Sequence, residues 1–390
     1  MRILYLGLMF SDTSLAEAYK YAKGGVQMAT HLFQAKLLKG LDREDIDLTV
    51  YNVPPVGSFP ISYKKLTIKE HTWGKNLQLG YLNIPFVKHA IQTRKLNKLV
   101  DKWIMDGEGE KSYIIAYSLY EPFLKVLDRV KSRYADLVHV CLLHTDAVPG
   151  RNSMYVNPKA IKLGDRLVSY TRQYDSFVIL SEHLKDVLEI NNRPYVITEC
   201  ICDDTQIAST VKSKSDNIFL YTGTTAEIYG IKNMVDAFIK VPEAQLWICG
   251  AGDSDDYIRD MATIYPNIKH YGYVGQDVVK RLRDECDFLI NPRMPTGTYT
   301  KYSFPSKTAE YLASSKPVVM YKLEGIADEY DDYINYIDAI DPDGIERQIR
   351  SLINMDYSVL VEKGNSAREF MLTNKTAQAQ ANKILDMLSR

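Results

Sequence analysis

Residues 288–321 read FLINPRMPTGTYTKYSFPSKTAEYLASSKPVVMY. The stretch begins with a short apolar run, continues through a polar loop into a helical pattern, and ends with a second apolar run. A strand, a helix and a second strand in this order predict a parallel pair joined by a crossover helix, the unit of α/β folds. Pro305 followed by Ser306 predicts a rigid turn and an N-cap, and the unpaired backbone N–H groups of such a helix start suit an anion.

The same alternation runs along most of the chain. Short apolar runs typical of buried parallel strands are separated by amphipathic helical patterns. We expect strands in the first half at 3–8, 48–53, 113–118, 138–143, 177–181 and 195–199, and in the second half at 218–222, 245–249, 268–272, 288–291, 317–321 and 333–337. The sequence therefore predicts an α/β fold of doubly wound, Rossmann-like sheets.

The length of 390 residues predicts two domains. A polar stretch at 213–216 suits a linker between them. We expect an N-terminal domain over 1–212, a C-terminal domain over 213–372, and a helix over 373–390 that packs back on the first domain. Two such domains would face each other across a cleft and bind ligands beyond the carboxyl ends of their strands.

Composition excludes several classes of protein. The chain has 48 Lys and Arg against 49 Asp and Glu, so its net charge of -1 gives no general reason to bind nucleic acid. Five cysteines without a C-x-x-C pair, and no apolar run that suits a signal peptide or a membrane span, predict a cytoplasmic protein with reduced thiols. The scattered histidines do not form a metal-binding motif, and the D-x-D spacing at 341–343 is followed by a helical pattern typical of a turn and helix start. The Gly-rich stretch 250–252 lacks the third glycine of a dinucleotide-binding fingerprint. We therefore expect no metal and no nicotinamide cofactor.

Charged residues surround the helix start described first. Arg293, Lys301 and Lys307 would place fixed positive charge around a diphosphate. Glu310, one turn into the helix, can accept two hydrogen bonds from a ribose diol. In the alternative, Ser306 only caps the helix and Glu310 only favours its dipole, which would be worth less than about 1 kcal/mol.

These motifs resemble those of a known family. The segment SFPSKTAEYLA at 303–313, ending in KPVV at 316–319, looks like the donor-site signature of retaining glycosyltransferases of the sucrose-synthase-like group, family 4, and above all of members that build bacterial surface polysaccharides. YTGT at 221–224, LWICGAGD at 246–253 and NPR at 291–293 agree with it in order. The resemblance implies the GT-B architecture of two Rossmann-like domains.

The resemblance also implies a nucleotide-diphosphosugar bound mainly by the second domain, with a UDP-sugar favoured over a GDP-sugar, and no resident cofactor. In similar enzymes the residue matching Glu310 holds the ribose, and the loop matching Tyr273 and Val274 flanks the base. The amides that match 304–306 meet the phosphates or the sugar. The expected donor-binding residues are Gly24, Gly25, Gly223, Thr224, Tyr273, Val274, Arg293, Lys301, Tyr302, Ser303, Phe304, Pro305, Ser306, Lys307 and Glu310.

The chain departs from the family pattern at two places. The family usually has a second glutamate where this chain has Tyr302. The family's Arg after the first strand of the second domain matches Thr224 or Thr225, and its Lys matches Tyr229; none of these residues is cationic. We expect Arg293 and Lys307 to neutralise the leaving diphosphate instead.

The first domain contributes further candidates. Gly24 and Gly25 precede a helical pattern and resemble the family's glycine loop, although an ordinary tight turn is the alternative. His144 and Asp146 follow the apolar run 138–143, where similar enzymes often have a histidine against the donor sugar. His144 would position or polarise that sugar, and Asp146 is the rival candidate as a base for an acceptor hydroxyl. A satisfied core histidine and a turn-forming aspartate are the alternatives.

The segment 61–102 is strongly basic. It contains nine basic and two acidic residues, interleaved with Trp73, Tyr81 and Phe86. Such a segment can meet an anionic membrane surface or acceptor. A solvated face of helix and loop is the favoured alternative.

The sequence thus predicts a metal-independent retaining glycosyltransferase that moves a hexosyl unit from a nucleotide sugar to a saccharide acceptor, lipid-linked or free, in surface polysaccharide assembly. Its expected catalytic residues are His144, Asp146, Arg293 and Lys307. We expect it in the cytoplasm and without nucleic acid. A peripheral membrane contact through 61–102 is the less favoured interpretation of that segment. Two alternatives stay open: a nucleotide-sugar epimerase of the same fold, and a non-catalytic nucleotide-sugar-binding protein, which the missing glutamate and cationic pair make plausible.

Overall fold

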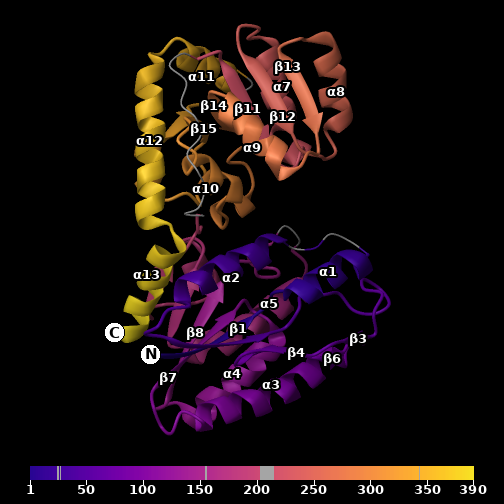
Figure 1. The fold of residues 1–390 in the computed structure, drawn as a ribbon, viewed down its shortest axis with the longest axis vertical. Coiled ribbons are helices and arrows are strands. Elements are labelled where there is room, and N and C mark those ends of the chain that lie inside the picture. Colours follow the sequence, from indigo (N-terminus) through magenta and orange to yellow (C-terminus); the bar gives the residue numbers. More distant parts are fainter. Residues whose placement is uncertain (24–25, 27, 154–155, 203–214, 342) are drawn as a thin grey trace. The chain divides into compact units, whose positions relative to one another are not determined.

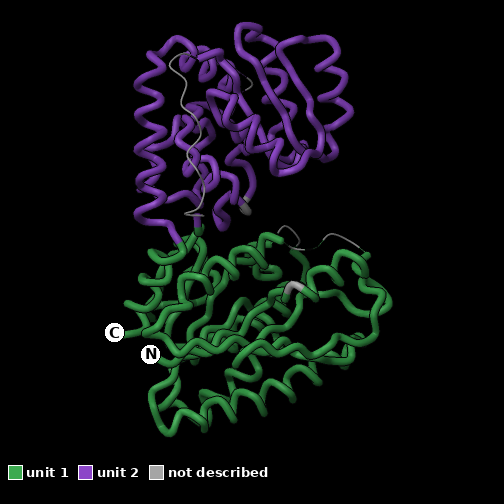
Figure 2. Tube along the Cα trace, in the orientation of Figure 1, with its two compact units in different colours: residues 1–201, 377–390 green, residues 202–376 purple. Residues whose placement is uncertain are grey.

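The computed structural model describes residues 1–390 apart from 24–25, 27, 154–155, 203–214 and 342. The chain divides into two compact units (Figure 2). Unit 1 consists of Met1–Ile201 and Ala377–Arg390, and unit 2 consists of Cys202–Thr376. The division after 212 that we expected from the sequence falls on residues outside the described ones, and the last helix begins at Ala377 instead of 373.

Unit 1 is built on an eight-stranded sheet with the order β10-β9-β8-β7-β1-β2-β5-β4 (Figure 1). All neighbours pair in parallel except β4 and β5, which are antiparallel, while β3 and β6 form a separate antiparallel pair. The strands are β1 (Arg2–Gly7), β2 (Asp47–Asn52), β3 (Thr67–Ile68), β4 (His71–Trp73), β5 (Asn76–Gln78), β6 (Tyr81–Leu82), β7 (Ser112–Tyr117), β8 (Val138–His144), β9 (Ser176–Ile179) and β10 (Tyr195–Ile197). The central strands are apolar along their length and almost wholly buried, as a sheet covered on both faces requires.

Helices cover both faces of this sheet. They are α1 (Asp12–Tyr21), α2 (Met28–Leu41), α3 (Lys88–Met105), α4 (Glu121–Tyr134), α5 (Pro158–Tyr170), α6 (Leu184–Val187) and α13 (Ala377–Ser389), with a 3-10 turn, η1 (Thr171–Gln173). Leu37 and Leu41 of α2 and Ile384 and Leu388 of α13 are buried together with side chains of β1, β2, β7 and β8. Helix α4 contacts both α3 and α5, and right-handed crossovers place these three helices on the opposite face.

Helix α13 completes the core of unit 1 although it follows unit 2 in the chain. Its closest approach is at Gly40 of α2, where a Cβ atom would lie only 2.1 Å from the carbonyl oxygen of Ala377. The lack of a side chain at Gly40 therefore lets the two helices touch through their backbones.

Unit 2 is built on a six-stranded, wholly parallel sheet with the order β13-β12-β11-β14-β15-β16 (Figure 1). Its strands are β11 (Ile218–Thr222), β12 (Gln245–Cys249), β13 (Ile268–Gly272), β14 (Phe288–Asn291), β15 (Val318–Tyr321) and β16 (Ile334–Ile337). Counted from β11, the strand order is the 3-2-1-4-5-6 of the doubly wound fold. Phe219 and Phe288, on the two central strands, stack with ring centroids 4.3 Å apart.

The helices of unit 2 form two groups. They are α7 (Ile231–Ile239), α8 (Asp255–Ile264), α9 (Gln276–Glu285), α10 (Ser306–Leu312), α11 (Gly344–Ile353) and α12 (Tyr357–Asn374), with 3-10 turns η2 (Glu227–Tyr229), η3 (Thr298–Lys301) and η4 (Asp328–Tyr333). Helix α7 contacts α8 and α11, whereas α10 contacts α12. Because the strand order reverses after β13, right-handed crossovers place α7 and α8 on one face and α9 and α10 on the other.

The structure confirms the expected α/β class, and each expected strand is present with its ends shifted by a residue or two at most. The description of 61–102 as helix and loop is wrong in its first half, which contains the four strands β3 to β6. These strands are two or three residues long, too short to show a period of alternation.

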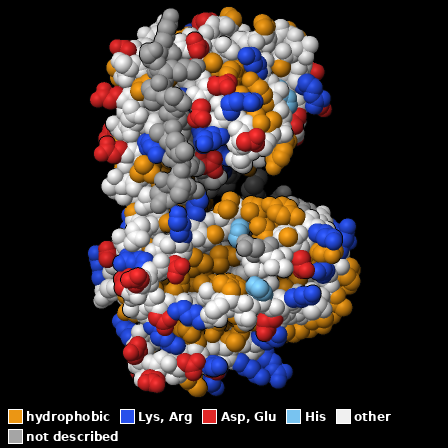
Figure 3. Space-filling model, in the orientation of Figure 1, with side chains coloured by type: hydrophobic (Ala, Val, Ile, Leu, Met, Phe, Trp, Pro, Cys, Tyr) orange, Lys and Arg blue, Asp and Glu red, His pale blue; other side chains and the backbone are white. Residues whose placement is uncertain are grey.

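Charge is mixed on the face of each unit that Figure 3 shows. The visible face of each unit carries Lys and Arg side chains among Asp and Glu (Figure 3), in keeping with the net charge of -1. No helix among the described residues has both the length and the apolar character to cross a bilayer.

Candidate active site

The strand order of unit 2 places a binding site between β11 and β14. The crossovers leave these neighbouring strands in opposite directions, which opens a crevice beyond their carboxyl ends. A cavity of about 240 Å³ lies there. It is lined by Tyr221, Thr222, Gly223, Thr224, Tyr229, Asn291, Arg293, Pro305, Ser306 and Lys307.

Two tyrosines hold the end of β11 at this cavity. The buried Tyr311 hydroxyl accepts a hydrogen bond from the Thr222 backbone N–H at 2.9 Å. The Tyr221 hydroxyl donates to the Thr224 carbonyl oxygen at 2.8 Å. Burial raises the pKa of both tyrosines, so both remain neutral hydrogen-bonding groups near neutral pH.

Glycines allow the neighbouring loops to approach one another. Gly230 has a φ of 80°, and a Cβ atom there would lie 2.4 Å from the carbonyl oxygen of Pro292. Gly250 has a φ of 152°, and a Cβ atom there would lie 1.7 Å from the carbonyl oxygen of Gly223. The loops after β11, β12 and β14 are thus packed backbone to backbone, which fixes the floor of the cavity.

Two cations line the cavity. The Arg293 guanidinium lies 5.3 Å from the centroid of the Tyr229 ring and donates a hydrogen bond to the Ser303 hydroxyl at 3.3 Å. Lys307 Nζ lies 2.8 Å from Glu310 Oε2, and both side chains are partly exposed. An ion pair of this exposure is worth about 1 kcal/mol or less, so a bound anion can compete for Lys307 at small cost.

The start of α10 differs from the sequence prediction. The N-cap residue is Pro305, with Ser306 the first residue of the helix, and no side chain caps it. Pro305, with its φ fixed near -66°, is the last residue with extended backbone angles. The helix therefore begins at Ser306, one residue earlier than it would if Ser306 were the cap. The prediction that Ser306 is the N-cap is therefore wrong, although Pro305 and Ser306 both line the cavity.

Other predicted donor residues lie outside the cavity lining. Lys301 pairs with Glu324 at 3.8 Å, and the ring of Phe304 is buried against Tyr330. Tyr302 and Ser303 precede α10 and are partly buried. Tyr273 and Val274 follow β13, at the far edge of the sheet from β14, and Tyr273 is largely exposed. Gly24 and Gly25 lie outside the described residues.

Unit 1 brings three polar side chains together at the carboxyl ends of β7 and β8. The Ser118 hydroxyl donates a hydrogen bond to Asp146 Oδ2 at 2.7 Å and lies 3.4 Å from His144 Nδ1. His144 is buried, and its burial lowers the pKa of the imidazole although the Asp146 carboxylate opposes this. His144 is therefore neutral near neutral pH and can take part in hydrogen bonds or proton transfer.

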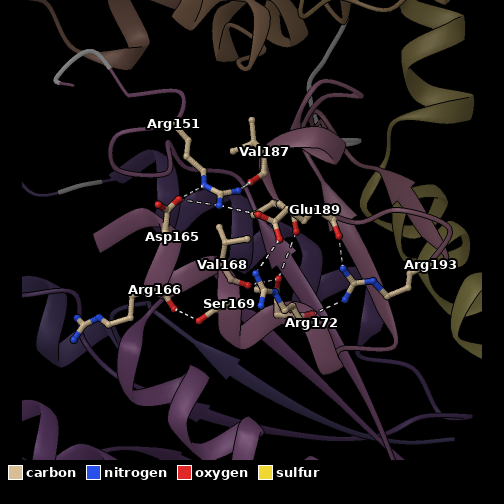
Figure 4. A network of polar contacts seen from close by, with 11 residues as sticks. Arg151, Asp165, Arg166, Val168, Ser169, Arg172, Val187, Glu189 and Arg193 are labelled. Atoms are coloured by element: carbon tan, nitrogen blue, oxygen red, sulfur yellow. Dashed lines mark hydrogen bonds and ion pairs between the residues drawn. The ribbon is translucent and has the colours of Figure 1, made fainter. Parts of the chain in front are cut away.

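A network of charged groups holds the loop after β8 (Figure 4). Arg151 donates to Asp165 of α5, to Glu189 and to the Val187 carbonyl oxygen, at 2.7 to 3.1 Å. Gly150, with a φ of 70°, lies so close to α5 that a Cβ atom there would be 2.3 Å from the Ile161 nitrogen. The loop that begins with Asp146 is thus fixed to α5 and to the end of α6.

Within the part of the chain that the structure describes, no three His, Cys, Asp or Glu side chains gather in a way that could hold a metal ion. Asp341 and Asp343 lie at the start of α11, where Asp341 accepts a hydrogen bond from Arg347 that lowers the pKa of its carboxyl group.

Several residues of these sites were missed by the sequence analysis. Tyr221, Thr222, Tyr229 and Asn291 line the cavity but were not among the predicted site residues. Ser118 was noted only as the last residue of an expected strand, and Tyr311 only as part of a signature. The position of Ser118 at a strand's carboxyl end is the signal that could have drawn attention to it.

One family model matches a part of the second unit. Residues 216–355 match the family model described as glycosyl transferases group 1. The match lies within unit 2 and includes every residue that lines the cavity. Unit 2 therefore carries a region similar to the group 1 glycosyl transferases.

Solved structures agree in fold. The chain is similar to TarM of S. aureus, with a TM-score of 0.56 and 13% identity over 80% of this chain and 59% of TarM. It is similar to the lipopolysaccharide outer core galactosyltransferase WaaB, with a TM-score of 0.62 and 11% identity over 100% of this chain and 99% of WaaB. It is similar to HepE of Anabaena, solved with UDP and glucose, with a TM-score of 0.60 and 13% identity over 100% of this chain and 99% of HepE.

At these identities the likeness shows the fold, which is the α/β architecture of the GT-B glycosyltransferases with two Rossmann-like domains. This confirms the fold predicted from the sequence. No curated protein matches the chain by sequence.

Proposed function

We propose that the protein is a retaining glycosyltransferase that moves a hexosyl unit from a nucleotide-diphosphosugar, by preference a UDP-sugar, to a saccharide acceptor. The observation that carries the proposal is the cavity between β11 and β14, because it combines two cations with hydroxyl groups inside the region similar to the group 1 glycosyl transferases. HepE, which has the same fold, was solved with UDP and glucose.

The cavity suits a leaving diphosphate. Arg293 and Lys307 supply positive charge where the bond to the sugar would break, and stabilisation of charge that develops in the transition state is the main electrostatic contribution to such catalysis. Arg293 comes from the loop after β14, which close backbone contacts fix, and Lys307 comes from the first turn of α10, so both cations need little reorganisation.

Glu310 is the proposed ribose ligand. When phosphate oxygens bind Lys307, the Glu310 carboxylate is released from its 2.8 Å ion pair and can accept hydrogen bonds from two hydroxyl groups. Binding of the diphosphate and of the ribose would then be coupled through this pair.

In unit 1 we propose His144 as the residue that positions the sugar and Asp146 as a base for an acceptor hydroxyl. Neutral His144 suits hydroxyl groups better than phosphates, and the partly exposed carboxylate of Asp146 is available to solutes. The roles proposed for Gly24 and Gly25 rest on the resemblance alone.

We further propose a role in surface polysaccharide assembly at the cytoplasmic face of a membrane. Phe86 is fully exposed, and Ile61, Leu66, Leu82 and Val87 are also exposed. Backbone hydrogen bonds from Asn83 N–H to the Leu66 carbonyl and from Phe59 N–H to the Asn83 carbonyl bring these segments together. Exposed apolar side chains within the basic segment are typical of a surface that binds anionic lipid.

The donor site is tested by thermal shift with nucleoside diphosphates, their sugars and inorganic pyrophosphate. A ligand at 100 times its dissociation constant stabilises a one-site protein by about 2.7 kcal/mol. We expect Arg293→Gln to weaken nucleotide and pyrophosphate alike by about 1.5 to 3 kcal/mol, and Glu310→Ala to weaken only the ligands that contain ribose. Lys240→Gln, which removes a cation paired with Asp343, is the matched control.

Equal loss of pyrophosphate binding in Glu310→Ala would contradict the ribose role, and no shift with any nucleotide would contradict the donor site. Product analysis with the donor alone separates transfer from epimerisation. A nucleotide that binds without turnover in the presence of saccharide acceptors would indicate a non-catalytic binding protein.

The membrane proposal is tested by sedimentation with liposomes of neutral or anionic lipid at low salt. We expect retention on anionic liposomes and its loss in the double variant Phe86→Ser, Val87→Ser. No retention of the wild type would contradict the proposal.

A further inference from the structure

Ser118 connects the two candidate catalytic residues of unit 1. It directly follows β7, and its backbone N–H donates to the Leu143 carbonyl of the neighbouring strand β8 at 2.6 Å. This bond holds the Ser118 side chain beside His144, the last residue of β8, and beside Asp146. Its Oγ is 2.7 Å from Asp146 Oδ2 and 3.4 Å from His144 Nδ1.

His144 also hydrogen-bonds to the Asp146 backbone, and because Nε2 has no partner among the described residues, Nδ1 is the nitrogen that makes this bond. The two contacts of Ser118 agree with this position of the protons. A carboxylate can only accept, so the single hydroxyl proton of Ser118 must point to Asp146. The Ser118 oxygen can then only accept from His144, which requires the proton of the neutral imidazole to be on Nδ1. His144 Nε2 is consequently left with a free lone pair.

Nε2 has no hydrogen-bond partner among the described residues, although it is buried. A buried polar atom without a partner costs about 1 to 3 kcal/mol, and native structures rarely keep one without a reason. A lone pair can be satisfied by an O–H or N–H donor but not by a phosphate oxygen. Less than 1 Å² of Nε2 is accessible, so a hydroxyl or amine of a ligand can become its partner only when the side chains around it move apart.

The backbone of Ser118 gives independent support. Its φ is 67°, in the left-handed region that costs a residue other than glycine about 1 kcal/mol or more. Glycine would adopt this conformation freely but would lack the hydroxyl group. This backbone conformation directs Ser118 Oγ toward His144 and Asp146.

We propose that Ser118 is a positioning residue that fixes His144 with its proton on Nδ1, and so makes Nε2 an acceptor for a sugar hydroxyl. The tautomer follows from the geometry alone, while the identity of the hydroxyl as that of a sugar rests on the proposed function.

The tautomer is tested by NMR of protein labelled with ¹⁵N-histidine, with His144→Gln to identify the signal. We expect Nε2 of His144 to be unprotonated at neutral pH in the wild type, and the proton to move toward Nε2 in both Ser118→Ala and Ser118→Gly. Agreement of the two variants would assign the effect to the hydroxyl, because only the glycine variant relieves the φ strain. A proton on Nε2 in the wild type, or no change in either variant, would overturn the proposal.

The hydroxyl acceptor is tested by the affinities of UDP-glucose and UDP. We expect Ser118→Ala to reduce the ratio of the affinity for UDP-glucose to that for UDP by about 2- to 10-fold, the factor that corresponds to one neutral hydrogen bond. The affinity for UDP itself should not change. Equal weakening of both ligands would show a merely structural role and overturn this half of the proposal. If neither ligand binds the wild type, the proposed function fails, and the NMR measurement still decides the role of Ser118.

Discussion

The Tyr311 hydroxyl illustrates how single atoms support the donor cavity. Its oxygen accepts from the Thr222 N–H and also lies 3.1 Å from the Thr222 hydroxyl, so it satisfies polar groups at the buried end of β11. Gly223 and Thr224, which line the cavity, follow at once. The position of these two residues therefore depends on a side chain of α10.

Tyr311→Phe should lower the free energy of unfolding by about 1 to 3 kcal/mol, because it leaves the Thr222 N–H buried without an acceptor. Calorimetry would show this as a fall of several degrees in the melting temperature. Tyr19→Phe, at a largely exposed tyrosine, is the control and should have little effect. Melting of Tyr311→Phe at the wild-type temperature would show that water replaces the hydroxyl.

At the scale of elements, α2 and α13 pack so closely at Gly40 that their backbones touch. Gly40→Ala should destabilise unit 1 by about 1 to 3 kcal/mol, since the new methyl group would overlap the Ala377 carbonyl and force the helices apart. The better helix propensity of alanine offsets only part of this, about 1 kcal/mol. Thermal denaturation followed by circular dichroism is the measurement.

Leu32→Ala, on the exposed side of the same helix, provides the comparison for Gly40→Ala and should melt close to the wild type. A Gly40→Ala variant more stable than the wild type would show that α13 can shift without loss of packing.

The longer elements could be predicted from the sequence because each buried strand is a continuous apolar run. The strands β3 to β6 could not, because two or three residues show no period. Arg293 and Lys307 were predicted to lie together because both flank one helix start, and they do line one cavity. The contact of Ser118 with His144 and Asp146 could not be predicted, because it depends on the register of β7 against β8 and on a left-handed backbone.

At the scale of the whole molecule, four histidines make stability depend on pH. Burial lowers the pKa of His89, His139, His144 and His270. Their pKa in the unfolded chain is about 6.5. Below that pH the unfolded chain binds protons that the folded chain does not, so the free energy of unfolding falls as pH falls from about 7 toward the folded-state pKa values.

We therefore expect a lower melting temperature at about pH 5.5 than at about pH 7.5, before the carboxyl groups titrate. His139→Gln, which can still hydrogen-bond to Ser176, should reduce this difference. If calorimetry resolves two transitions, unit 1 should show the larger change, since three of the four histidines belong to it. A melting temperature that is constant or rises on acidification would contradict the assignment.

The return of α13 to unit 1 has a consequence for synthesis on the ribosome. Unit 2 is one continuous segment, Cys202–Thr376, and can fold as soon as it has emerged. Unit 1 is translated first, yet the sheet face that packs against α2 is not fully covered until Ile384 and Leu388 of α13 have been translated. Nascent unit 1 therefore exposes an apolar surface throughout translation of unit 2, and a chaperone that binds such surfaces would meet its substrate there.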